Sequence, residues 1–495
     1  MLLNSIVKEL DFVIIQGNIN REVSSIAYDS REVIYNSIFV AITGFTVDGH
    51  NYIEKAIEKG ATTIVVEKDI DIDENITVLK VKSSRKALAL ISANYFSNPT
   101  EKLNLIGITG TNGKTSTTYF IKSILDYANK ATGIIGTIGT VIDNKLIKTK
   151  NTTPESLNLQ QIFSEMVEAD TENCIMEVSS HALSLSRVAY CSFNTGIFTN
   201  LSPDHLELHK TMEEYFNAKA QLFELTTDYN IVNIDDEYGK KLAARIKNYD
   251  AKLVTFGIED ASADIYATKI SCQADNTTYV AHTPKGSVKI KVKLPGIINV
   301  YNSLAAIACA YCNNISLQDI KEGINGLERI KGRFETVYQD NDYKVIVDFA
   351  HTEDGLEKAL TTIKPFAKGR IILVFGVYAA AGEMGKEKRR SMGKVAVKYA
   401  DFAVVTSDNP KDQDPNLIIR DIVEAIEEEG GSYQAIIDRR EAINFAINLS
   451  KKGDIILITG KGHETSQIIG KEEIPFSEAE IVNEIMQKAK ELRIS

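Results

Sequence analysis

The sequence has few features suited to disulfide, membrane or nucleic-acid chemistry. Its five cysteines lie in apolar segments, and the closely spaced Cys309 and Cys312 fall in a helix-like run without a second pair. That context favours a core helix over metal or redox chemistry. No run of eighteen apolar residues occurs, so no transmembrane helix is expected. The 67 acidic residues outnumber the 56 basic ones, which leaves a net charge of −11 and no broad basic surface for nucleic acid.

The N-terminal stretch MLLNSIVKELDFVII has early acidic side chains and no small-residue cleavage site, unlike a secretory signal peptide. We therefore expect a cytoplasmic protein, and a monomer is the simplest expectation for its assembly. A chain of 495 residues is too long for one hydrophobic core, and about three domains are expected at typical domain sizes.

The order of apolar and polar segments predicts an α/β protein with three domains. Short β-prone runs alternate with helical runs over residues 1–98, 99–330 and 331–495, a pattern typical of mostly parallel sheets covered by helices. The first is interpreted as an N-terminal α/β domain, the second as a central P-loop-type ATPase domain with a mostly parallel sheet, and the third as a C-terminal Rossmann-like α/β domain. Within the second, residues 277–296 are expected to form an antiparallel hairpin.

A phosphate-binding loop is predicted where IGITGTNGKTST passes from an apolar strand to a helix. Gly110 and Gly113 allow close backbone approach, so that successive N–H groups and the helix N-terminus face one anion. Lys114 would neutralise phosphate charge, and the Thr115 hydroxyl suits Mg²⁺. The general pattern has a glycine where Ile108 stands, so a variant loop is expected. A glycine turn without a ligand is the alternative.

Glu177 and His205 are candidate magnesium residues, because each follows a predicted strand of the ATPase domain. A carboxylate at a strand end near a phosphate loop can hold Mg²⁺ directly or through water. Alternatively, Glu177 is an ordinary surface acid and Ser179 or Ser180 caps a helix. His205 and His209 are four apart, but the zincin pattern H-E-x-x-H is absent, so His205 is interpreted as an outer magnesium ligand or a phosphate neighbour.

Four further segments allow both a structural and a binding interpretation. The turn NTTPE could bind an anion or a sugar, or cap the next helix. Asn299 and Asn302 could cap a helix or contact an adenine edge, and Arg333 could bridge domains or clamp a phosphate. Lys219, taken alone, is typical of a solvated helix lysine.

The third domain carries polar side chains at the ends of its predicted strands. They are Asp348, His351, Asp408, Asn409, Lys461, His463 and Glu464. Ligands of open α/β sheets bind at the carboxyl ends of parallel strands. A catalytic cleft is therefore expected between this domain and the ATPase domain.

A set of motifs in this order resembles the Mur ligases, ATP-dependent enzymes that add amino acids to the nucleotide-linked precursor of bacterial peptidoglycan. The motifs are TGTNGKTS, NTTPE, EVSSHAL, FTNLSPDHLELH, AKAQLF, NVYNSLAA, GRFE, DFAHTEDGLEKAL, SDNPK and GKGHE, and with YDSR they span nearly the whole chain. Within the family, the sequence is most similar to the MurE type, which adds the third stem-peptide residue to UDP-N-acetylmuramoyl-L-alanyl-D-glutamate.

The resemblance implies that the N-terminal domain binds the UDP-linked substrate and that the C-terminal domain binds the incoming amino acid. It also implies a role for each matching residue. Catalysis would involve Lys114, Glu177, His205, Lys219 and His351. ATP would contact Gly110, Thr111, Asn112, Gly113, Lys114, Thr115, Asn299, Asn302, Arg333 and Asp348. The UDP substrate would contact Ser30, Asn151, Thr152, Thr153, Ser179 and Arg187, and the incoming amino acid Asp408, Asn409, Pro410, Lys411, Gly460 and Glu464. Mg²⁺ would lie near Thr115, Glu177, His205 and Lys219, the last carbamylated by CO₂ and so turned from a cation into an anion.

The implied reaction activates a carboxylate, whose oxygens are poor leaving groups. Phosphoryl transfer from ATP to the D-glutamate side chain would give an acyl phosphate, and the neutral amine of the incoming amino acid would displace phosphate. Lys114, Arg333 and Mg²⁺ would stabilise the transferring charge. Domain closure would orient the reactants and exclude water.

The GKGHE motif favours meso-diaminopimelate as the incoming amino acid, but the sequence departs from the family elsewhere. Lys411 stands where an arginine with a bidentate fork is usual, and Leu185 where a glutamine often helps to bind the uridine substrate. Residues 378–390 replace a short GGDRD-like turn. Arg389 and Arg390 either take over from the arginine of that turn or only solvate a helix start.

Three alternatives stay open on the sequence. The same reaction could use L-lysine or another diamino acid. The chain could be a paralogue with another acceptor, such as a folylpolyglutamate synthase, although a folate enzyme should lack the N-terminal domain with YDSR. It could also be a catalytically retired nucleotide-binding scaffold, against which Lys114, Glu177, Lys219 and Arg333 argue.

Overall fold

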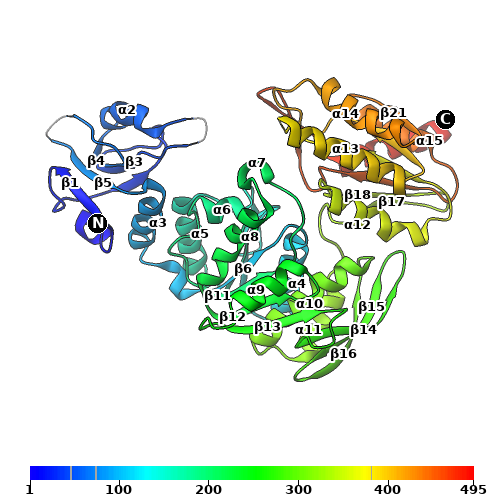
Figure 1. Ribbon diagram of the computed structural model, residues 1–495, viewed down its shortest axis with the longest axis horizontal. Coiled ribbons are helices and arrows are strands. Elements are labelled where there is room, and N and C mark those ends of the chain that lie inside the picture. Colours follow the sequence, from blue (N-terminus) through cyan, green and yellow to red (C-terminus); the bar gives the residue numbers. More distant parts are fainter. Residues whose placement is uncertain (45–46, 73–74, 381, 495) are drawn as a thin grey trace.

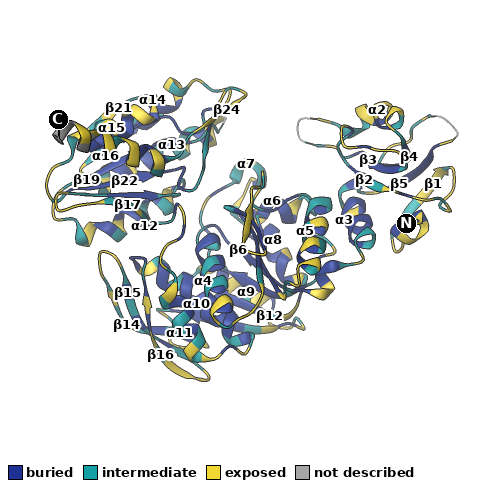
Figure 2. Ribbon diagram, turned by 180° about the vertical axis from the view of Figure 1, so that it is seen from behind, coloured by how far each residue is buried: buried dark blue, intermediate teal, exposed yellow. Residues whose placement is uncertain are grey.

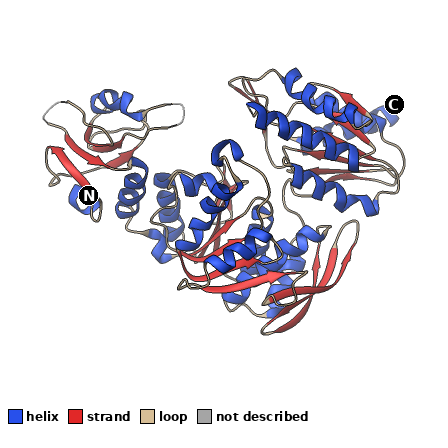
Figure 3. Cartoon of the chain, in the orientation of Figure 1, coloured by secondary structure: helices blue, strands red, loops and turns tan. Residues whose placement is uncertain are grey.

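The chain forms three successive α/β units in the computed structural model, which describes residues 1–44, 47–72, 75–380 and 382–494. Each unit has a sheet of its own, and the middle unit connects the other two (Figure 1). Helices flank the strands in every unit (Figure 3). The predicted three-domain α/β architecture is confirmed, while the boundaries after residues 98 and 330 stay predictions.

The first unit is a five-stranded sheet with the order β1-β5-β4-β3-β2, in which only β1 runs antiparallel to its neighbour. Its strands are β1 (Phe12–Gln16), β2 (Ser25–Ala27), β3 (Ser37–Val40), β4 (Ala61–Val66) and β5 (Thr77–Val81), and its helices are α1 (Leu3–Ile6), α2 (Ile53–Glu58) and α3 (Ser84–Tyr95). An ion pair of 3.1 Å between Arg85 and Glu155 attaches α3 to the second unit.

The second unit contains an eleven-stranded sheet with a parallel centre and antiparallel ends, in the order β16-β15-β14-β13-β12-β11-β6-β10-β7-β8-β9. The parallel strands are β6 (Asn104–Thr109), β7 (Thr132–Gly136), β10 (Asn173–Glu177), β11 (Phe193–Phe198), β12 (Thr226–Asn233), β13 (Lys252–Gly257) and β14 (Ile265–Cys272). The ends are formed by β8 (Gly139–Ile142), β9 (Lys145–Ile147), β15 (Thr277–Thr283) and β16 (Gly286–Val292). The pairing of β15 with β16 confirms the predicted antiparallel hairpin.

Helices of the second unit follow its strands and carry much of the candidate site. They are α4 (Lys114–Tyr127), α5 (Ser156–Glu168), α6 (Ser180–Ser184), α7 (Leu206–His209), α8 (Met212–Ala220), α9 (Glu237–Arg245), α10 (Ile297–Cys312) and α11 (Leu317–Gly326). Cys309 and Cys312 are buried in α10, as the sequence predicted. The Ser179 side chain accepts a hydrogen bond from the Ala182 N–H and so caps α6, the structural interpretation that the sequence left open.

The third unit is a six-stranded sheet with the order β17-β18-β22-β19-β20-β21, parallel except for β17. Its strands are β17 (Glu335–Gln339), β18 (Lys344–Asp348), β19 (Ile371–Phe375), β20 (Phe402–Val405), β21 (Tyr433–Ala435) and β22 (Ile455–Thr459), with a separate hairpin of β23 (Ser466–Ile469) and β24 (Glu472–Pro475). Its helices are α12 (Glu353–Ile363), α13 (Gly382–Tyr399), α14 (Pro415–Glu428), α15 (Arg439–Leu449) and α16 (Glu478–Ile494).

Buried apolar strands form the core of each unit (Figure 2). Every residue of β19 (IILVF) and β22 (IILIT) is buried, because parallel strands covered on both faces need a continuous apolar run. One buried cluster contains Ile108 and Ile121 of the second unit and also Leu356 of the third, so apolar packing joins these two units. Among the described residues, none of the helices has the length and apolarity needed to span a bilayer.

Candidate active site

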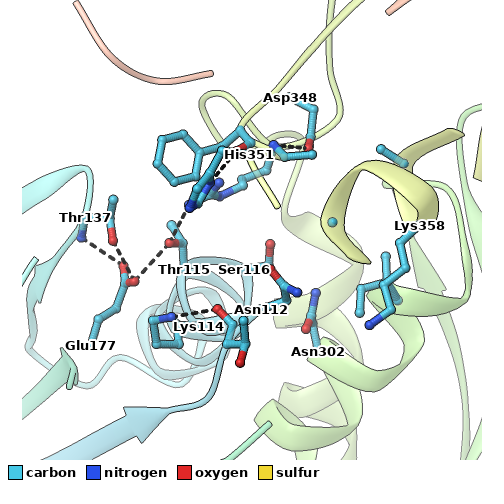
Figure 4. Close-up of a pocket in the computed structure, with 18 of the residues that line it drawn as sticks. Asn112, Lys114, Thr115, Ser116, Thr137, Glu177, Asn302, Asp348, His351 and Lys358 are labelled. Carbon is cyan, nitrogen blue, oxygen red and sulfur yellow. Dashed lines mark hydrogen bonds between the residues drawn. The ribbon is translucent and has the colours of Figure 1, made fainter. Parts of the chain in front are cut away.

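A cavity of about 320 Å³ lies where the second and third units meet. The predicted residues that line it are Thr111, Asn112, Gly113, Lys114, Thr115, Thr152, Glu177, Ser179, His205, Asn299, Asn302, Arg333, Asp348 and His351. They come from the loop after β6, the turns before α5 and α7, the end of β10 and the residues after it, the start of α10 and the segment around β18. Several of them point toward one space (Figure 4). The structure therefore brings most of the predicted nucleotide and metal residues together.

The loop between β6 and α4 has a backbone that only glycine accommodates at two positions. Gly110 and Gly113 have φ angles of 144° and 88°. A Cβ atom on Gly113 would lie 2.3 Å from the Asn302 side-chain oxygen, and one on Gly110 would lie 2.0 Å from the Thr199 hydroxyl. The loop is thus pressed against α10 and the end of β11, which leaves its N–H groups at the start of α4 as an anion site.

Two lysines converge on one carbonyl of this loop. Lys114 Nζ donates hydrogen bonds to the carbonyl oxygens of Gly110 and Thr111, each at 2.9 Å, and Lys219 Nζ also donates to Gly110 at 2.9 Å. Lys219 is buried and lies over the Tyr215 ring, with Nζ 4.6 Å from its centroid. The interpretation of Lys219 as a solvated helix lysine is therefore wrong.

Burial and like charge both act on this lysine pair. Burial lowers the pKa of Lys114. It lowers the pKa of Lys219 well below its ordinary value, and the neighbouring Lys114 charge lowers that pKa further, while Asp204 opposes the shift. The Lys219 side chain is consequently closer to a free amine than a surface lysine is.

Glu177 ends β10 and is held by three hydrogen bonds (Figure 4). The Thr115 hydroxyl donates to Oε2 at 3.0 Å, and Thr137 donates through its backbone N–H to Oε1 at 3.0 Å and through its hydroxyl to Oε2 at 2.9 Å. Its side chain is buried, so the interpretation of Glu177 as an ordinary surface acid is wrong. Thr137 was not predicted, although its place after β7, a neighbour of β10 in the sheet, was a usable signal.

Arg333 connects the third unit to the phosphate loop. Its Nη2 donates to the Thr115 hydroxyl at 2.8 Å, and its guanidinium lies over the Phe349 ring at 4.4 Å from the centroid. The Asp348 carboxylate accepts from the backbone N–H groups of Phe334 and Ala350, each at 2.8 Å, and burial raises its pKa despite the Arg333 charge. This turn holds Arg333 at the cavity wall, where it bridges the two units.

The start of α12 adds contacts that were not predicted. The Asp354 carboxylate accepts from the Asn112 side-chain amide at 2.6 Å, from the Ser202 hydroxyl at 3.2 Å and from Lys358 at 2.7 Å. Lys358 also lines the cavity. The third unit therefore contacts the phosphate loop through a carboxylate as well as through Arg333.

His205 and His351 line the cavity, and the His181 ring packs against the rings of His205 and His209. Burial lowers the pKa of His351 to about 4, and that of His181 and His209 also to about 4. The His205 ring lies 4.9 Å from the His181 ring, and its nitrogens are 3.4 Å from Asp204 and 3.5 Å from Glu207. Near neutral pH, His351 donates from Nδ1 to the Phe349 carbonyl at 2.9 Å, which leaves Nε2 as an acceptor, and the ring adds no positive charge.

The donor atoms fit a hard cation better than a transition metal. The Glu177 carboxylate and the Thr115 hydroxyl are oxygen ligands of the kind that Mg²⁺ prefers, with phosphate and water completing its shell. Across the ranges that the structure describes, no group of three or more His, Cys, Asp or Glu side chains is arranged to hold a metal. Lys219 as an amine adds nothing to such a shell, whereas an anionic derivative would.

Three family models match consecutive parts of the chain. They are "Mur ligase family, catalytic domain" over residues 22–96, "Mur ligase middle domain" over 108–310, and "Mur ligase, glutamate ligase domain" over 332–462. A protein of Clostridioides difficile (strain 630), named UDP-N-acetylmuramoyl-L-alanyl-D-glutamate–2,6-diaminopimelate ligase, is 45% identical over 488 residues, which cover 99% of this chain and 100% of that protein. The chain belongs to the Mur ligase family.

Other Mur ligases match over similar lengths. A protein of the same name from Clostridium perfringens (strain 13 / Type A) is 45% identical over 491 residues, covering 98% of this chain and all of that one. A solved structure with that name has a TM-score of 0.69 at 27% identity, with 99% of each chain covered. The resemblance predicted from the motifs is thus confirmed.

The predicted UDP-substrate residues of this Mur ligase fall into two places. Thr153 donates through its hydroxyl to the Glu177 backbone carbonyl at 2.8 Å and accepts from the Ser179 N–H at 3.1 Å, and Arg187 donates to the Thr153 carbonyl at 3.0 Å. These residues lie beside Thr152 at the cavity edge. Ser30 is buried in the first unit, and Asn151 is exposed, so neither lines this cavity.

The predicted amino-acid residues of the Mur ligase gather after β20 and β22. Lys461 Nζ donates to the Asn409 side-chain oxygen at 3.0 Å and to Glu464 at 2.6 Å, and the Asn409 amide donates to Glu464 at 3.2 Å. Gly460 has a φ of 116°, and a Cβ there would lie 2.6 Å from an Asp408 carboxylate oxygen. Pro410 is buried and Lys411 is exposed. None of them lines the 320 Å³ cavity.

The segment of residues 378–390 forms a loop and the start of α13, with Ala381 outside the described residues. Arg389 donates to Asp421 and to the Ala380 carbonyl, each at 2.8 Å, and Arg390 pairs with Glu428. Both guanidiniums are thus engaged in holding α13 against its neighbours. Arg389 is buried, so it does not solvate a helix start.

Proposed function

We propose that this chain is an ATP-dependent ligase that joins meso-2,6-diaminopimelate to UDP-N-acetylmuramoyl-L-alanyl-D-glutamate in peptidoglycan precursor synthesis. The observation that carries the proposal is a cavity between two units in which a glycine loop, a lysine, a buried carboxylate and a partly buried arginine face one space. Relatives that match the chain from end to end are named for this reaction. A cytoplasmic, monomeric enzyme is part of the proposal.

The proposed ligation has two steps, phosphorylation of a carboxylate and displacement of the phosphate by an amine. An oxygen of the D-glutamate side-chain carboxylate takes the γ-phosphoryl group of ATP, the bond to ADP breaks, and an acyl phosphate forms. The lone pair of the neutral amine then attacks the acyl carbon, the bond to phosphate breaks, and the nitrogen gives up one proton as the amide forms. The products are amide, ADP, phosphate and one proton.

The chain's own cations are placed to stabilise the charge that is transferred. Lys114 is folded back onto two loop carbonyls, and a polyphosphate lying across the loop would offer its ammonium a stronger, charged acceptor. Arg333 is oriented in advance by the Phe349 ring and the Thr115 hydroxyl, so little reorganisation is needed when charge develops. Asp354 and Arg333 together keep the third unit against the loop and limit the entry of water.

Magnesium would be held by Glu177 and Thr115, where it would neutralise phosphate charge; His205 would be an outer neighbour. The proposed modification of Lys219 follows from its chemistry. A buried amine with a lowered pKa is nucleophilic, and its addition to CO₂ with loss of one proton gives a carbamate anion. The modification would replace the amino group that now donates to the Gly110 carbonyl with an anionic group that attracts a metal.

The choice of amino acid rests on the segment after β22. Glu464 is the carboxylate that would meet the distal ammonium of diaminopimelate, and it is already held by Lys461 and Asn409. Lys411 would offer charge without a bidentate fork to the distal carboxylate. L-Lysine, which lacks that carboxylate, is the alternative donor.

A donor panel tests the proposal directly. Purified chain would be given ATP, Mg²⁺ and UDP-N-acetylmuramoyl-L-alanyl-D-glutamate with meso-diaminopimelate, LL-diaminopimelate, L-lysine, ornithine or no amino acid. Phosphate release and product mass would be followed, with Lys114→Met as the inactive control. Product with meso-diaminopimelate alone is expected. Product with lysine would change the donor, and no product with any amine would refute the ligase function.

A further inference from the structure

Lys388, on the first turns of α13, contacts the wall of the nucleotide cavity from the third unit. Its Nζ lies 3.2 Å from an Asp204 carboxylate oxygen, although the two residues are 184 positions apart in the sequence. Asp204 and its neighbour His205 both line the cavity. The side chains of Lys388 and Asp204 are only 18% and 6% exposed, so this ion pair is far better shielded than a surface pair.

Tyr378, from the same segment of residues 378–390, holds Lys388 in place. Lys388 donates to the Tyr378 hydroxyl at 3.0 Å, and its Nζ lies 4.4 Å from the centroid of the Tyr378 ring. The Tyr378 ring also lies 6.3 Å from the ring of His351, which lines the cavity. The lysine is therefore fixed from two sides before any substrate binds.

The other end of this chain of contacts is the amino-acid segment, which is the set of predicted amino-acid-binding residues after β20 and β22 that includes Asn409 and Glu464. The backbone N–H of Ala379, next to Tyr378, donates to the Asn409 carbonyl at 3.0 Å. Asn409 in turn holds Glu464 through its side chain. A continuous path of bonded groups therefore leads from Glu464 to Asp204, from the amino-acid segment to the nucleotide cavity.

We propose that Lys388 is a positioning residue that fixes the amino-acid segment relative to the phosphoryl-transfer cavity through its ion pair with Asp204. The inference rests on the proposed ligase function and gives a role to the segment that replaces the family's short turn. At this position Lys388 supplies a positive charge without the bidentate fork of an arginine. Without it, the incoming amine would be bound less firmly and less well aligned with the acyl phosphate.

Steady-state kinetics of Lys388→Met test the proposal. The KM for the diamino acid should rise and kcat should fall, together lowering kcat/KM for that substrate by roughly 100-fold, the size of effect expected from a small misplacement of a reactant. The KM for ATP should stay within about twofold, because the contacts of Arg333 and Asp354 with the loop are kept. Lys388→Arg should recover a substantial part of the loss.

Two further variants control for structural damage. Asp204→Asn combined with Lys388→Met removes the unpaired buried carboxylate, and the double variant should be no less active than Lys388→Met alone if the two residues act as one unit. Lys394→Met lies on the same helix, where Lys394 is half exposed and 3.7 Å from Glu429, and it should behave as wild type.

The outcomes separate the inference from the function. A merely structural role for Lys388 would lower the active fraction, and so kcat, without changing the KM for the diamino acid; that result overturns the inference while the ligase function stands. Unchanged kinetics, or equal increases in the KM values of all three substrates, also overturn it. A wild-type chain that forms no product overturns both.

Discussion

Lys114 and Lys219 donate to the same backbone oxygen, the carbonyl of Gly110, each at 2.9 Å. Positive charges on both amino groups would repel each other, and the charge of Lys114 accordingly adds to burial in lowering the pKa of Lys219. One way to relieve that repulsion is to change the charge of one partner. Carbamylation of Lys219 would convert the repulsion into an attraction.

Lys219→Ala should abolish ligation, and added bicarbonate should not restore it, because no amine remains to react with CO₂. The wild-type chain should show a carbamate signal in ¹³C NMR after exposure to labelled bicarbonate. Lys240→Ala, on the exposed side of α9, is the matched control and should keep both the signal and activity. Near-normal turnover of Lys219→Ala would end the idea.

Gly113→Ala should weaken nucleotide binding at least tenfold while leaving the fold intact. An alanine at a φ of 88° is strained, and its Cβ would lie 2.3 Å from the Asn302 side-chain oxygen, so the loop or α10 must shift. Calorimetric titration with ADP measures the change. Gly326→Ala, where a Cβ meets nothing within 4 Å, is the control and should bind as wild type. Equal affinity of the two variants would contradict the expectation.

Thr137→Val should raise the Mg²⁺ concentration needed for half-maximal activity and lower kcat about tenfold. The change removes one hydroxyl bond to Glu177 but keeps the backbone bond, and a hydrogen bond to a charged group contributes about 1.5–3 kcal/mol. Activity measured over a Mg²⁺ series checks this. Thr361→Val, on the exposed face of α12, should leave the series unchanged. If Thr137→Val has the same Mg²⁺ dependence as wild type, Thr137 does not position the metal carboxylate.

Stability should fall as pH drops below about 6.5, in part because of two partly buried histidines. Burial lowers the pKa of His351 to about 4 and that of His463 to about 3, so the fold favours their neutral forms. As pH falls below 6.5, these histidines bind protons in the unfolded chain but not in the folded one. Each such group lowers the free energy of unfolding by up to about 1.4 kcal/mol per pH unit. Above that pH this contribution is fully present.

His463→Gln isolates one of these groups. Its melting temperature should fall less steeply between pH 6.5 and 4 than that of the wild type, since one proton uptake is gone. Thermal unfolding at several pH values measures the two slopes, and the variant is compared with the wild type at pH 7.5 to remove any general loss. Parallel curves would show that His463 is not held neutral by the fold.

The glycine loop and the sheet class could be predicted because their signals are local. A short apolar strand, two glycines and a lysine at a helix start specify the geometry within one segment, and the fully buried strands are visible as continuous apolar runs. The helix periodicity of α8 did not reveal that Lys219 is buried, because burial there is set by Tyr215 and by the Gly110 carbonyl of another segment.

The contacts between the units were beyond sequence reasoning for the same physical reason. Asn112 meets Asp354 across 242 positions, and Asp204 meets Lys388 across 184, and no periodicity links such partners. The two arginines of residues 378–390 show the opposite case, in which the sequence suggested a contact that the structure does not support. Arg389 and Arg390 had the right charge and nearly the right place for a substrate contact, but acidic residues on α14 engage both.

The hydrogen bond between Asn112 and Asp354 has a consequence for the rate of turnover. A spent nucleotide in the 320 Å³ space would be walled in by one unit on the loop side and by the other at α12. Movement of the third unit away from the loop would break the Asn112–Asp354 contact, widen the way out for the nucleotide and carry the amino-acid-binding residues away from the newly made peptide. One domain movement would then release both products, and the rate of turnover would be limited by that movement rather than by bond formation.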